Sequence, residues 1–305
     1  MTDGALVKQI WNSTMKLCTI PNRKQSTLIG IILLTCILFL YLGVRDPYYF
    51  FIWKTEGKKQ WIPQNVVPYG RDEFPVKIPA RTGLLELSQP EAEELYYSYI
   101  QTIQVLCQRI VRVGSIFDGG KELCIDEPYK PKRPCLVYSF GINWKWDFDE
   151  DMVTLFGCEV FAFDPSMANE TDFFKKGPNI TFHKIGLWDR HTVNDNGWHL
   201  MTLKQIRTKL GHENRIIDVM KIDIDWSEWT ALPEVITSGE LETVKQMLIE
   251  FHSNDNKETL NVFRMLFDAG FRIFMKERNI LGCLYKVPWS IRERPHCIEI
   301  SFIHI

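Results

Sequence analysis

Hydrophobic residues after position 134 fall into short apolar runs, and stretches with helical spacing separate these runs. Such runs are typical of strands that are buried on both faces of a sheet. We predict strands at 135–141, 158–164, 179–187, 215–225, 244–252, 271–276 and 297–303, and helices at 148–156, 203–210, 226–236 and 258–269. Alternating strands and helices indicate an α/β domain with a mostly parallel sheet covered on both faces.

A longer helical pattern precedes the strands. Apolar residues recur at spacings of three and four from Leu95 to Ile110, and Gly114 follows the run. Pro90 and the acidic residues after it suit a first helical turn. We therefore expect a packing helix that ends near Gly114 and opens a domain over 90–305, whose sheet core begins near residue 134.

One segment carries no charged residue. Residues 26–44 read STLIGIILLTCILFLYLGV. At about 1.5 Å per residue, this length spans a hydrocarbon core roughly 30 Å thick. The run is longer than the apolar region of a signal peptide, and no small-residue cleavage site closes it. We expect a short N-terminal tail over 1–25, a transmembrane signal anchor over 26–44 and a proline-containing stem over 45–89.

The side of the membrane on which the domain lies is not decided by Lys and Arg, because the two flanks of the anchor are similar. Two sequons, at Asn169 and Asn179, and six of the eight Cys lie beyond the anchor. Both features favour a type II glycoprotein with a lumenal domain in the endoplasmic reticulum or Golgi. A cytosolic domain with free thiols and accidental sequons stays open as the alternative.

The amino-acid composition and net charge exclude some classes of protein and of partner. The 305 residues include 45% hydrophobic and 24% charged positions, as in ordinary globular proteins, which excludes a disordered chain. The formal net charge is -2, so no basic excess is available for a nucleic-acid backbone. We therefore expect no nucleic-acid partner.

Acidic residues stand at the ends of three predicted strands. Asp164 ends the second strand, Asp223 and Asp225 end the fourth, and His252 closes the fifth, two residues after Glu250. Ligands of open α/β sheets bind beyond the carboxyl ends of the strands, so these side chains are expected to converge on one cleft. An acid that ends the second strand can accept hydrogen bonds from both hydroxyls of a ribose.

Three segments carry a family resemblance. They are residues 135–142 (CLVYSFGI), 157–166 (GCEVFAFDPS) and 220–229 (MKIDIDWSEW). They resemble the methyltransferase-like protein 24 group, which is similar to FkbM-type class I methyltransferases. The resemblance covers about residues 95–303 and implies a Rossmann-like, seven-stranded methyltransferase sheet that binds S-adenosylmethionine.

The same resemblance implies roles for single residues. The turn that carries Ser139, Gly141 and Asn143 matches the first cofactor motif. Asp164 matches the ribose acid, and Asp223 matches the acid near the methionine end of the cofactor.

Methyl transfer to a hydroxyl benefits from a base, and Asp225 and His252 are the candidates. The acceptor is expected to be a small molecule or a glycan. If the fourth strand persists through both Asp223 and Asp225, their carboxylates lie side by side with a positive group near them, Lys221 being one candidate. We expect no metal ion, because backbone N–H groups and Ser227 can satisfy the acid pair.

Two alternatives stay open. The Asp223-Ile-Asp225 triplet has the form of the metal motif of Golgi-type glycosyltransferases, which also have a signal anchor and a stem. A catalytically inactive protein with the methyltransferase fold is the second alternative, because Asn143 and Trp144 stand where cofactor loops carry small residues.

Overall fold

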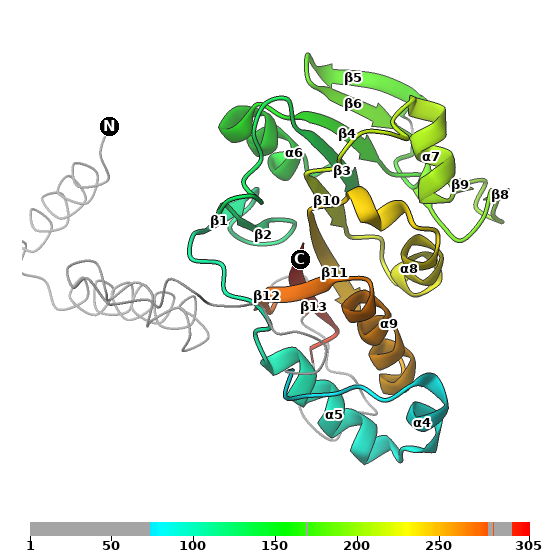
Figure 1. Ribbon diagram of the computed structural model, residues 1–305. Helices are drawn as coiled ribbons and strands as arrows, with labels where there is room; N and C mark the ends of the chain where they lie inside the picture. The colour runs from blue at the N-terminus through cyan, green and yellow to red at the C-terminus, as the bar shows by residue number, and fades with distance from the viewer. Residues whose placement is uncertain (1–73, 169, 280–282, 284–294) are drawn as a thin grey trace, which may run out of the picture. The chain divides into compact units, whose positions relative to one another are not determined.

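The structure, a computed structural model, describes residues 74–168, 170–279, 283 and 295–305, all within the compact unit of residues 65–305 (Figure 1). The helices are α4 (Arg81–Glu86), α5 (Gln89–Gln101), α6 (Asp147–Asp151) with a π-helical turn (Met152–Phe156), α7 (Leu203–Leu210), α8 (Glu228–Thr237), a 3-10 turn (Glu240–Thr243) and α9 (Asn256–Asp268). The strands are β1 (Ile110–Val113), β2 (Lys121–Cys124), β3 (Leu136–Phe140), β4 (Glu159–Phe163), β5 (Phe173–Gly177), β6 (Ile180–His183), β7 (Gly186–Leu187), β8 (Thr192–Val193), β9 (His199–Met201), β10 (Val219–Ile222), β11 (Gln246–His252), β12 (Phe271–Glu277) and β13 (Cys297–His304).

Eight strands form one sheet in the order β12-β13-β11-β10-β3-β4-β6-β5. The run from β11 to β6 is parallel. β13 pairs antiparallel with β11, β12 pairs antiparallel with β13, and β5 pairs antiparallel with β6. The mostly parallel α/β core is thus confirmed, but the sheet has eight strands rather than seven because β5 folds back on β6. The chain leaves β3 towards β4 and β6 and later returns to β10 and β11. Strand order therefore reverses between β3 and β10, the position at which open α/β sheets bind ligands.

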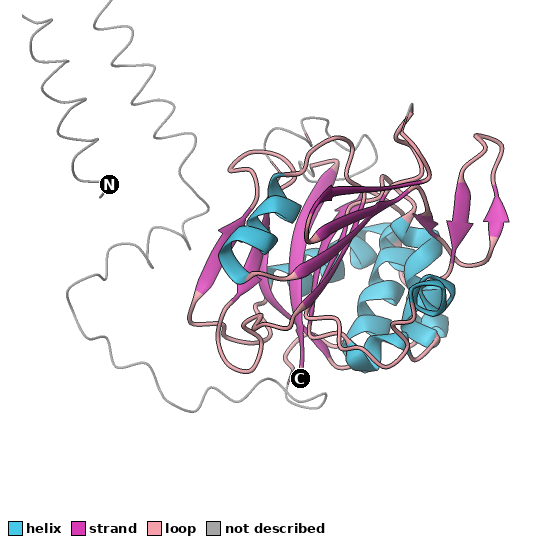
Figure 2. Cartoon of the chain, turned by 90° about the horizontal axis from the view of Figure 1, so that it is seen from above, coloured by secondary structure: helices cyan, strands magenta, loops and turns pink. Residues whose placement is uncertain are grey.

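Both faces of the sheet are covered, as the apolar strands require (Figure 2). On one face, Tyr138 and Phe140 of β3 belong to the larger core cluster, which includes buried residues of α5, α7, α8 and α9. On the other face, Val137 packs in a second cluster with residues of the β1–β2 hairpin and of the α6 region. The alternation of side chains along β3 produces this division.

Helix ends follow from local sequence signals. Ser88 and Glu91 form a capping box at the start of α5, with Pro90 in its first turn. Thr202 and Gln205 form a second box at α7, which ends at Gly211 in a left-handed conformation. Each box satisfies N–H groups that have no partner within the helix.

The helix expected to run towards Gly114 is shorter than predicted. α5 ends at Gln101, and the backbone N–H groups of Gln104 and Val105 donate to Ile273 O of β12 at 2.8 and 3.2 Å. The apolar positions that continue the helical spacing belong to an extended segment and to β1. Apolar residues at spacings of three and four do not by themselves distinguish a continuing helix from an extended segment. Here the hydrogen bonds to β12 end the helix.

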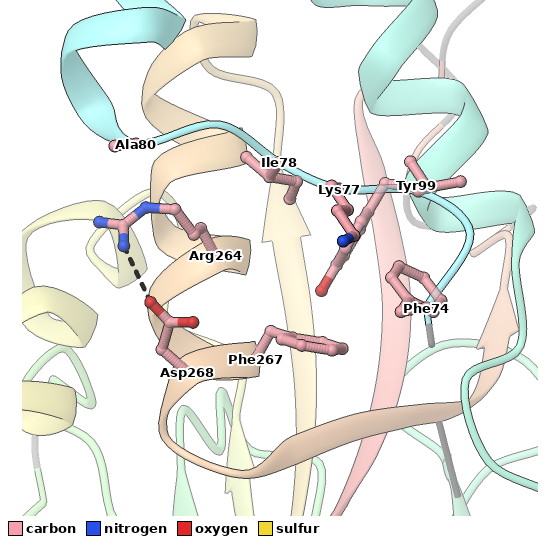
Figure 3. A pocket seen from close by; sticks show the side chains of 9 residues that line it. Phe74, Lys77, Ile78, Ala80, Tyr99, Arg264, Phe267 and Asp268 are labelled. Atoms are coloured by element: carbon pink, nitrogen blue, oxygen red, sulfur yellow. Dashed lines mark hydrogen bonds and ion pairs between the residues drawn. The ribbon is translucent and has the colours of Figure 1, made fainter. Parts of the chain in front are cut away.

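The described part of the expected stem, residues 74–89, packs on the domain. Phe74 is buried, and its ring lies 5.5 Å from that of Tyr99 and 5.3 Å from that of Phe267. These three rings line a cavity of about 290 Å³ (Figure 3). α9 runs back from the carboxyl end of β11, so the cavity, which lies beside the last turn of α9, is away from the predicted cleft.

No helix among the described residues is long and apolar enough to span a membrane. The tail over 1–25 and the anchor predicted over 26–44 lie outside the described residues.

Candidate active site

The carboxyl ends of the central strands bring the predicted residues together. Phe140 of β3 pairs with Phe163 of β4 on one side and with Ile222 of β10 on the other. The next residues along these strands are Gly141, Asp164 and Asp223, so all three leave the sheet at one edge. The convergence predicted from the strand-end acids is confirmed.

Gly141 is required by the packing of its turn. Its φ is +79°, and a Cβ atom at this position would lie 1.5 Å from the carbonyl oxygen of Asp223. Its own carbonyl oxygen accepts a hydrogen bond of 2.7 Å from Lys221 Nζ. The absence of a side chain therefore serves the contact between the β3 turn and β10.

The Asp164 carboxylate holds the same turn in place. Its Oδ2 accepts hydrogen bonds from the N–H groups of Ile142 and Asn143 at 2.9 and 2.8 Å. Its Oδ1 accepts bonds from Ser166 N at 2.8 Å and from Ser166 Oγ at 2.6 Å. A carboxylate offers about four acceptor positions, so these four bonds occupy all of them. The Ser166 hydroxyl is the partner that can leave by rotation of its side chain.

Asn143 and Ser139, which are also predicted to bind the cofactor, differ in solvent exposure. Asn143 is exposed, with a φ of +42°. Ser139, by contrast, is fully buried within β3. The side-chain alternation of β3 turns Ser139 into the interior, so a role of Ser139 in cofactor binding, which stays a prediction, would have to come from the backbone of the turn.

Asp223 is paired with cations rather than with Asp225. Its Oδ2 lies 3.1 Å from Lys121 Nζ and 3.5 Å from Lys221 Nζ. Burial would raise the pKa of Asp223, but the two ammonium groups hold it well below its usual range. The positive charge expected near the acids is thus present, and it comes from two ammonium groups, of which Lys221 was predicted. Lys121 was missed, because it comes from β2, which is distant in the sequence.

Lys121 lies at the centre of a buried group of acids. Its side chain is 1% exposed, and its Nζ is 2.5 Å from Glu299 Oε1. Carboxylate oxygens of Asp223, Glu250 and Glu299 all lie within 4.8 Å of one another, a spacing that can hold a metal ion. Here the Lys121 ammonium contacts two of the three. Burial would lower the pKa of Lys121, but the surrounding carboxylates, Asp223 foremost, raise it above its usual value.

The strand does not persist through Asp223 and Asp225, so the side-by-side placement expected for an extended strand does not apply. β10 ends at Ile222, and Asp225 and Trp226 have left-handed φ values of +44° and +64°. The Asp225 side chain is 80% exposed, and its Oδ1 is 3.5 Å from His252 Nε2. The two acids of the Asp-x-Asp triplet are therefore not on one face of an extended strand, and Asp223 is already paired with the ammonium groups of Lys121 and Lys221.

His252 is held by a buried acid that sequence analysis missed. Glu228 is fully buried in the first turn of α8, and its Oε1 lies 3.0 Å from His252 Nδ1. The same oxygen accepts the backbone N–H of His252 at 2.7 Å. Burial would lower the pKa of His252, but the hydrogen bond to Glu228 and nearby carboxylates raise it above its usual value. The sequence feature that could have identified Glu228 is its position in the first turn of the helix that follows the fourth predicted strand.

This contact assigns the histidine tautomer. A carboxylate only accepts hydrogen bonds, so His252 Nδ1 carries a proton and donates it to Glu228. The Trp226 N–H, 3.4 Å from the same nitrogen, is then not its partner. His252 Nε2 lies 3.5 Å from Asp225 Oδ1 and 3.4 Å from Glu250 Oε1. In the neutral ring this nitrogen can accept a proton.

Comparisons with known proteins indicate the family of the domain. Residues 85–289 match a family described as a methyltransferase domain. The chain is 27% identical over 180 residues to "Probable methyltransferase-like protein 24" of Rattus norvegicus, covering 54% of this chain and 48% of that protein. It is also 27% identical over 172 residues to the Homo sapiens protein of the same name, covering 52% and 46%. The chain thus spans about half the length of the curated relatives it matches.

A solved structure, the Methanococcus jannaschii fibrillarin pre-rRNA processing protein, is similar at 10% identity with a TM-score of 0.34. The match covers 71% of this chain and 74% of that chain. The family match covers most of the domain and confirms the resemblance seen in the sequence. The chain belongs to this methyltransferase-domain family.

Proposed function

We propose that the domain is a methyltransferase that uses S-adenosylmethionine and transfers the methyl group to a hydroxyl acceptor. The observation that carries this proposal is the gathering of the Gly141 turn, Asp164 and Asp223 at the edge where strand order reverses, with Asp225 and His252 beside them. Methyl transfer mainly requires that the donor and the acceptor are held in line, and little covalent chemistry is needed from the protein.

The residues present fit the cofactor. S-adenosylmethionine, when bound, supplies an electrophilic methyl group on a sulfonium. Asp164 would hold one ribose hydroxyl at the Oδ1 position that the Ser166 hydroxyl leaves when it rotates away. Asp223 keeps its negative charge because Lys121 and Lys221 lower its pKa, so it suits a cationic group of the ligand.

The protein's own residues handle the acceptor proton. Glu228 fixes the His252 ring through Nδ1, so the ring cannot turn its other nitrogen away from the cleft. His252 Nε2 then takes the hydroxyl proton, and the exposed Asp225 carboxylate accepts a hydrogen bond from the acceptor. Because His252 must be neutral to act as a base, the rate of transfer rises with pH through the pKa of His252.

Binding measurements test the proposal directly. We expect isothermal titration of the purified protein with S-adenosylmethionine to give saturable heat, and to give the same affinity with a chelator present. A folded parent protein that does not bind S-adenosylmethionine overturns the methyltransferase proposal and favours a protein that kept the fold without the activity. Binding of a nucleotide sugar that depends on manganese would instead support sugar transfer.

We further propose that the domain lies on the lumenal side of a membrane and is anchored through residues 26–44. Cys107 with Cys124, Cys135 with Cys158, and Cys283 with Cys297 are disulfide-bonded pairs, and such pairs persist in oxidising compartments. Peptide mapping without reductant should recover these pairs from the cell-made protein. Recovery of all six thiols in the free form would contradict the lumenal proposal.

A further inference from the structure

We propose that the acceptor hydroxyl belongs to a saccharide and that Trp226 is the surface on which the sugar ring stacks. This inference rests on the proposed methyltransferase function and names the acceptor class for the same site. It is carried by the position, exposure and fixation of one aromatic side chain next to the proton acceptor.

Trp226 is exposed and yet held firmly. The residue is 48% exposed to solvent. Its Nε1 donates a hydrogen bond of 3.3 Å to Ser253 O, and its ring lies 4.7 Å from the ring of His252 and 4.6 Å from that of His296. A large apolar side chain fixed at the surface by its neighbours offers a preformed flat contact to a ligand, because no side-chain entropy is lost on binding.

The backbone supports the same conclusion. Trp226 follows Asp225, and both residues have left-handed φ values. On the neighbouring strand, Asn143 and Trp144 form a matching turn with φ values of +42° and +64°, and Trp144 is 51% exposed. Consecutive non-glycine residues in this region are strained, and such strain is concentrated at ligand sites. Two adjacent strands, paired at Phe140 and Ile222, therefore each present a polar residue followed by an exposed indole.

The chemistry of this surface fits a sugar. A pyranose has an apolar C–H face and a rim of hydroxyls, and an indole ring provides a flat apolar surface of matching size. Asp225 precedes Trp226 in the chain, and the His252 ring lies 4.7 Å from the Trp226 ring in a tilted arrangement. The Asp225 carboxylate and, in the neutral ring, His252 Nε2 can both accept hydrogen bonds from hydroxyl groups. An aliphatic lipid would leave the Asp225 carboxylate without a role.

A cationic acceptor is the rival for an aromatic surface beside a carboxylate, because ammonium groups bind aromatic faces. His252 argues against it. Burial would lower the pKa of His252, but the hydrogen bond to Glu228 and nearby carboxylates raise it, which favours the positively charged ring and disfavours a second cation beside it. A neutral hydroxyl acceptor meets no such repulsion.

The proposed transfer balances. The acceptor oxygen forms the new bond to the methyl carbon as the bond between that carbon and sulfur breaks. The electron pair stays on sulfur, which leaves as the neutral thioether of S-adenosylhomocysteine. The hydroxyl proton passes to His252 Nε2.

The test compares full-length parent protein with Trp226→Ala, Trp226→Phe and the control Trp198→Ala, a partly exposed indole in the β8–β9 loop. Protein saturated with S-adenosylhomocysteine is applied to an array of N-linked and O-linked oligosaccharides, and transfer of labelled methyl groups from S-adenosylmethionine to the same glycans is measured in parallel. A thermal melt of each variant reports folding.

We expect the parent protein to bind and methylate a subset of the glycans. Trp226→Ala should lose at least tenfold in glycan binding, Trp226→Phe should retain most of it, and Trp198→Ala should match the parent. Affinity for S-adenosylmethionine should change less than twofold in all three variants.

Three results overturn the inference. In the first, the parent binds S-adenosylmethionine but neither binds nor methylates any arrayed glycan. In the second, Trp226→Ala weakens S-adenosylmethionine binding as much as glycan binding, which assigns the ring to the cofactor. In the third, a folded Trp226→Ala protein binds glycans like the parent. A parent that does not bind S-adenosylmethionine defeats the proposed function itself, so the two failures are distinguishable.

Discussion

Glu228 Oε1 lies 3.0 Å from His252 Nδ1 and accepts the backbone N–H of the same histidine at 2.7 Å. The fully buried carboxylate therefore sets both the orientation of the ring and its protonation. Buried charges are retained in proteins when they are paired, and this pair joins the first turn of α8 to the end of β11.

Glu228→Gln removes the charge and keeps the shape of the side chain, so the pKa of His252 should fall. Because the folded-state pKa of His252 is raised, the pair stabilises the protein fully below the unfolded-state pKa, and this stability is lost as pH rises through the folded-state pKa. The stability deficit of the variant should thus be larger at pH 5.5 than at pH 8.5.

Histidine NMR titration and urea unfolding at the two pH values measure these effects. His212, which bonds the Tyr138 hydroxyl at 2.8 Å, serves as an internal reference whose titration should not move. An unchanged His252 titration in a folded Glu228→Gln protein would contradict the assignment.

Asp164→Asn replaces one carboxylate oxygen by an NH2 donor, so in either orientation of the amide at least one of the N–H groups of Ile142, Asn143 and Ser166 loses its acceptor. We expect a loss of about 1–3 kcal/mol in the free energy of unfolding, because buried N–H groups lose their partner. Affinity for S-adenosylmethionine should fall roughly 10-fold to 100-fold, as expected for loss of a charge-assisted hydrogen bond. Chemical denaturation and calorimetry report the two quantities separately.

Ser166→Ala is the matched control, since it removes one donor to Asp164 and leaves the carboxylate. It should cost about 1 kcal/mol of stability and should not weaken cofactor binding, because the hydroxyl that competes with the ribose for Oδ1 is gone. Unchanged affinity in Asp164→Asn would remove Asp164 from the site, and equal weakening in both variants would assign the contact to the Ser166 hydroxyl.

Lys121→Met leaves the buried carboxylates of Asp223 and Glu299 without their ammonium partner. Breaking a buried ion pair from one side costs about 3–5 kcal/mol, so the unfolding free energy should drop by this amount at neutral pH. Burial raises the pKa of Glu299, so protonation of this acid should reduce the deficit as pH falls. Guanidinium unfolding across pH measures the change.

Lys145→Met provides the comparison, because Lys145 pairs with Asp118 at the surface. Exposed pairs contribute about 0–1 kcal/mol, so this variant should unfold nearly like the parent. Equal losses in the two lysine variants would show that burial of the Lys121 group has no energetic consequence.

Asn179 lies exposed in the turn between β5 and β6, where its sequon is accessible to glycosylation. If the domain is lumenal, Asn179→Gln should remove one glycan from the cell-made protein and shift its electrophoretic mobility, while Asn196→Gln, an exposed asparagine outside a sequon, should not. Endoglycosidase treatment should abolish the difference. A C-terminus that is accessible to protease in intact microsomes would place the domain on the cytosolic side.

Several elements were predictable because their signals are local. The strand that ends at Asp164 and the helix from Leu203 to Leu210, which ends before Gly211, are confirmed, since apolar runs, capping residues and glycine act within a few residues. The convergence of Gly141, Asp164 and Asp223 was predictable for the same reason, because parallel strands place their carboxyl ends at one edge.

Tertiary structure decided what long-range contacts control. Lys121 comes from a hairpin and Glu228 from a helix, and each reaches its partner only because burial makes an unpaired charge costly. β10 ends at Ile222, directly before Asp223, and the chain then turns at Asp225. The spacing of residues in the sequence does not predict that the strand ends there. The sequence by itself determined the strands, the edge and the acids that meet there, because these depend on periodicity. The fold decided which cation neutralises which acid and which nitrogen of His252 faces the cleft, because those choices depend on groups brought together across the whole chain.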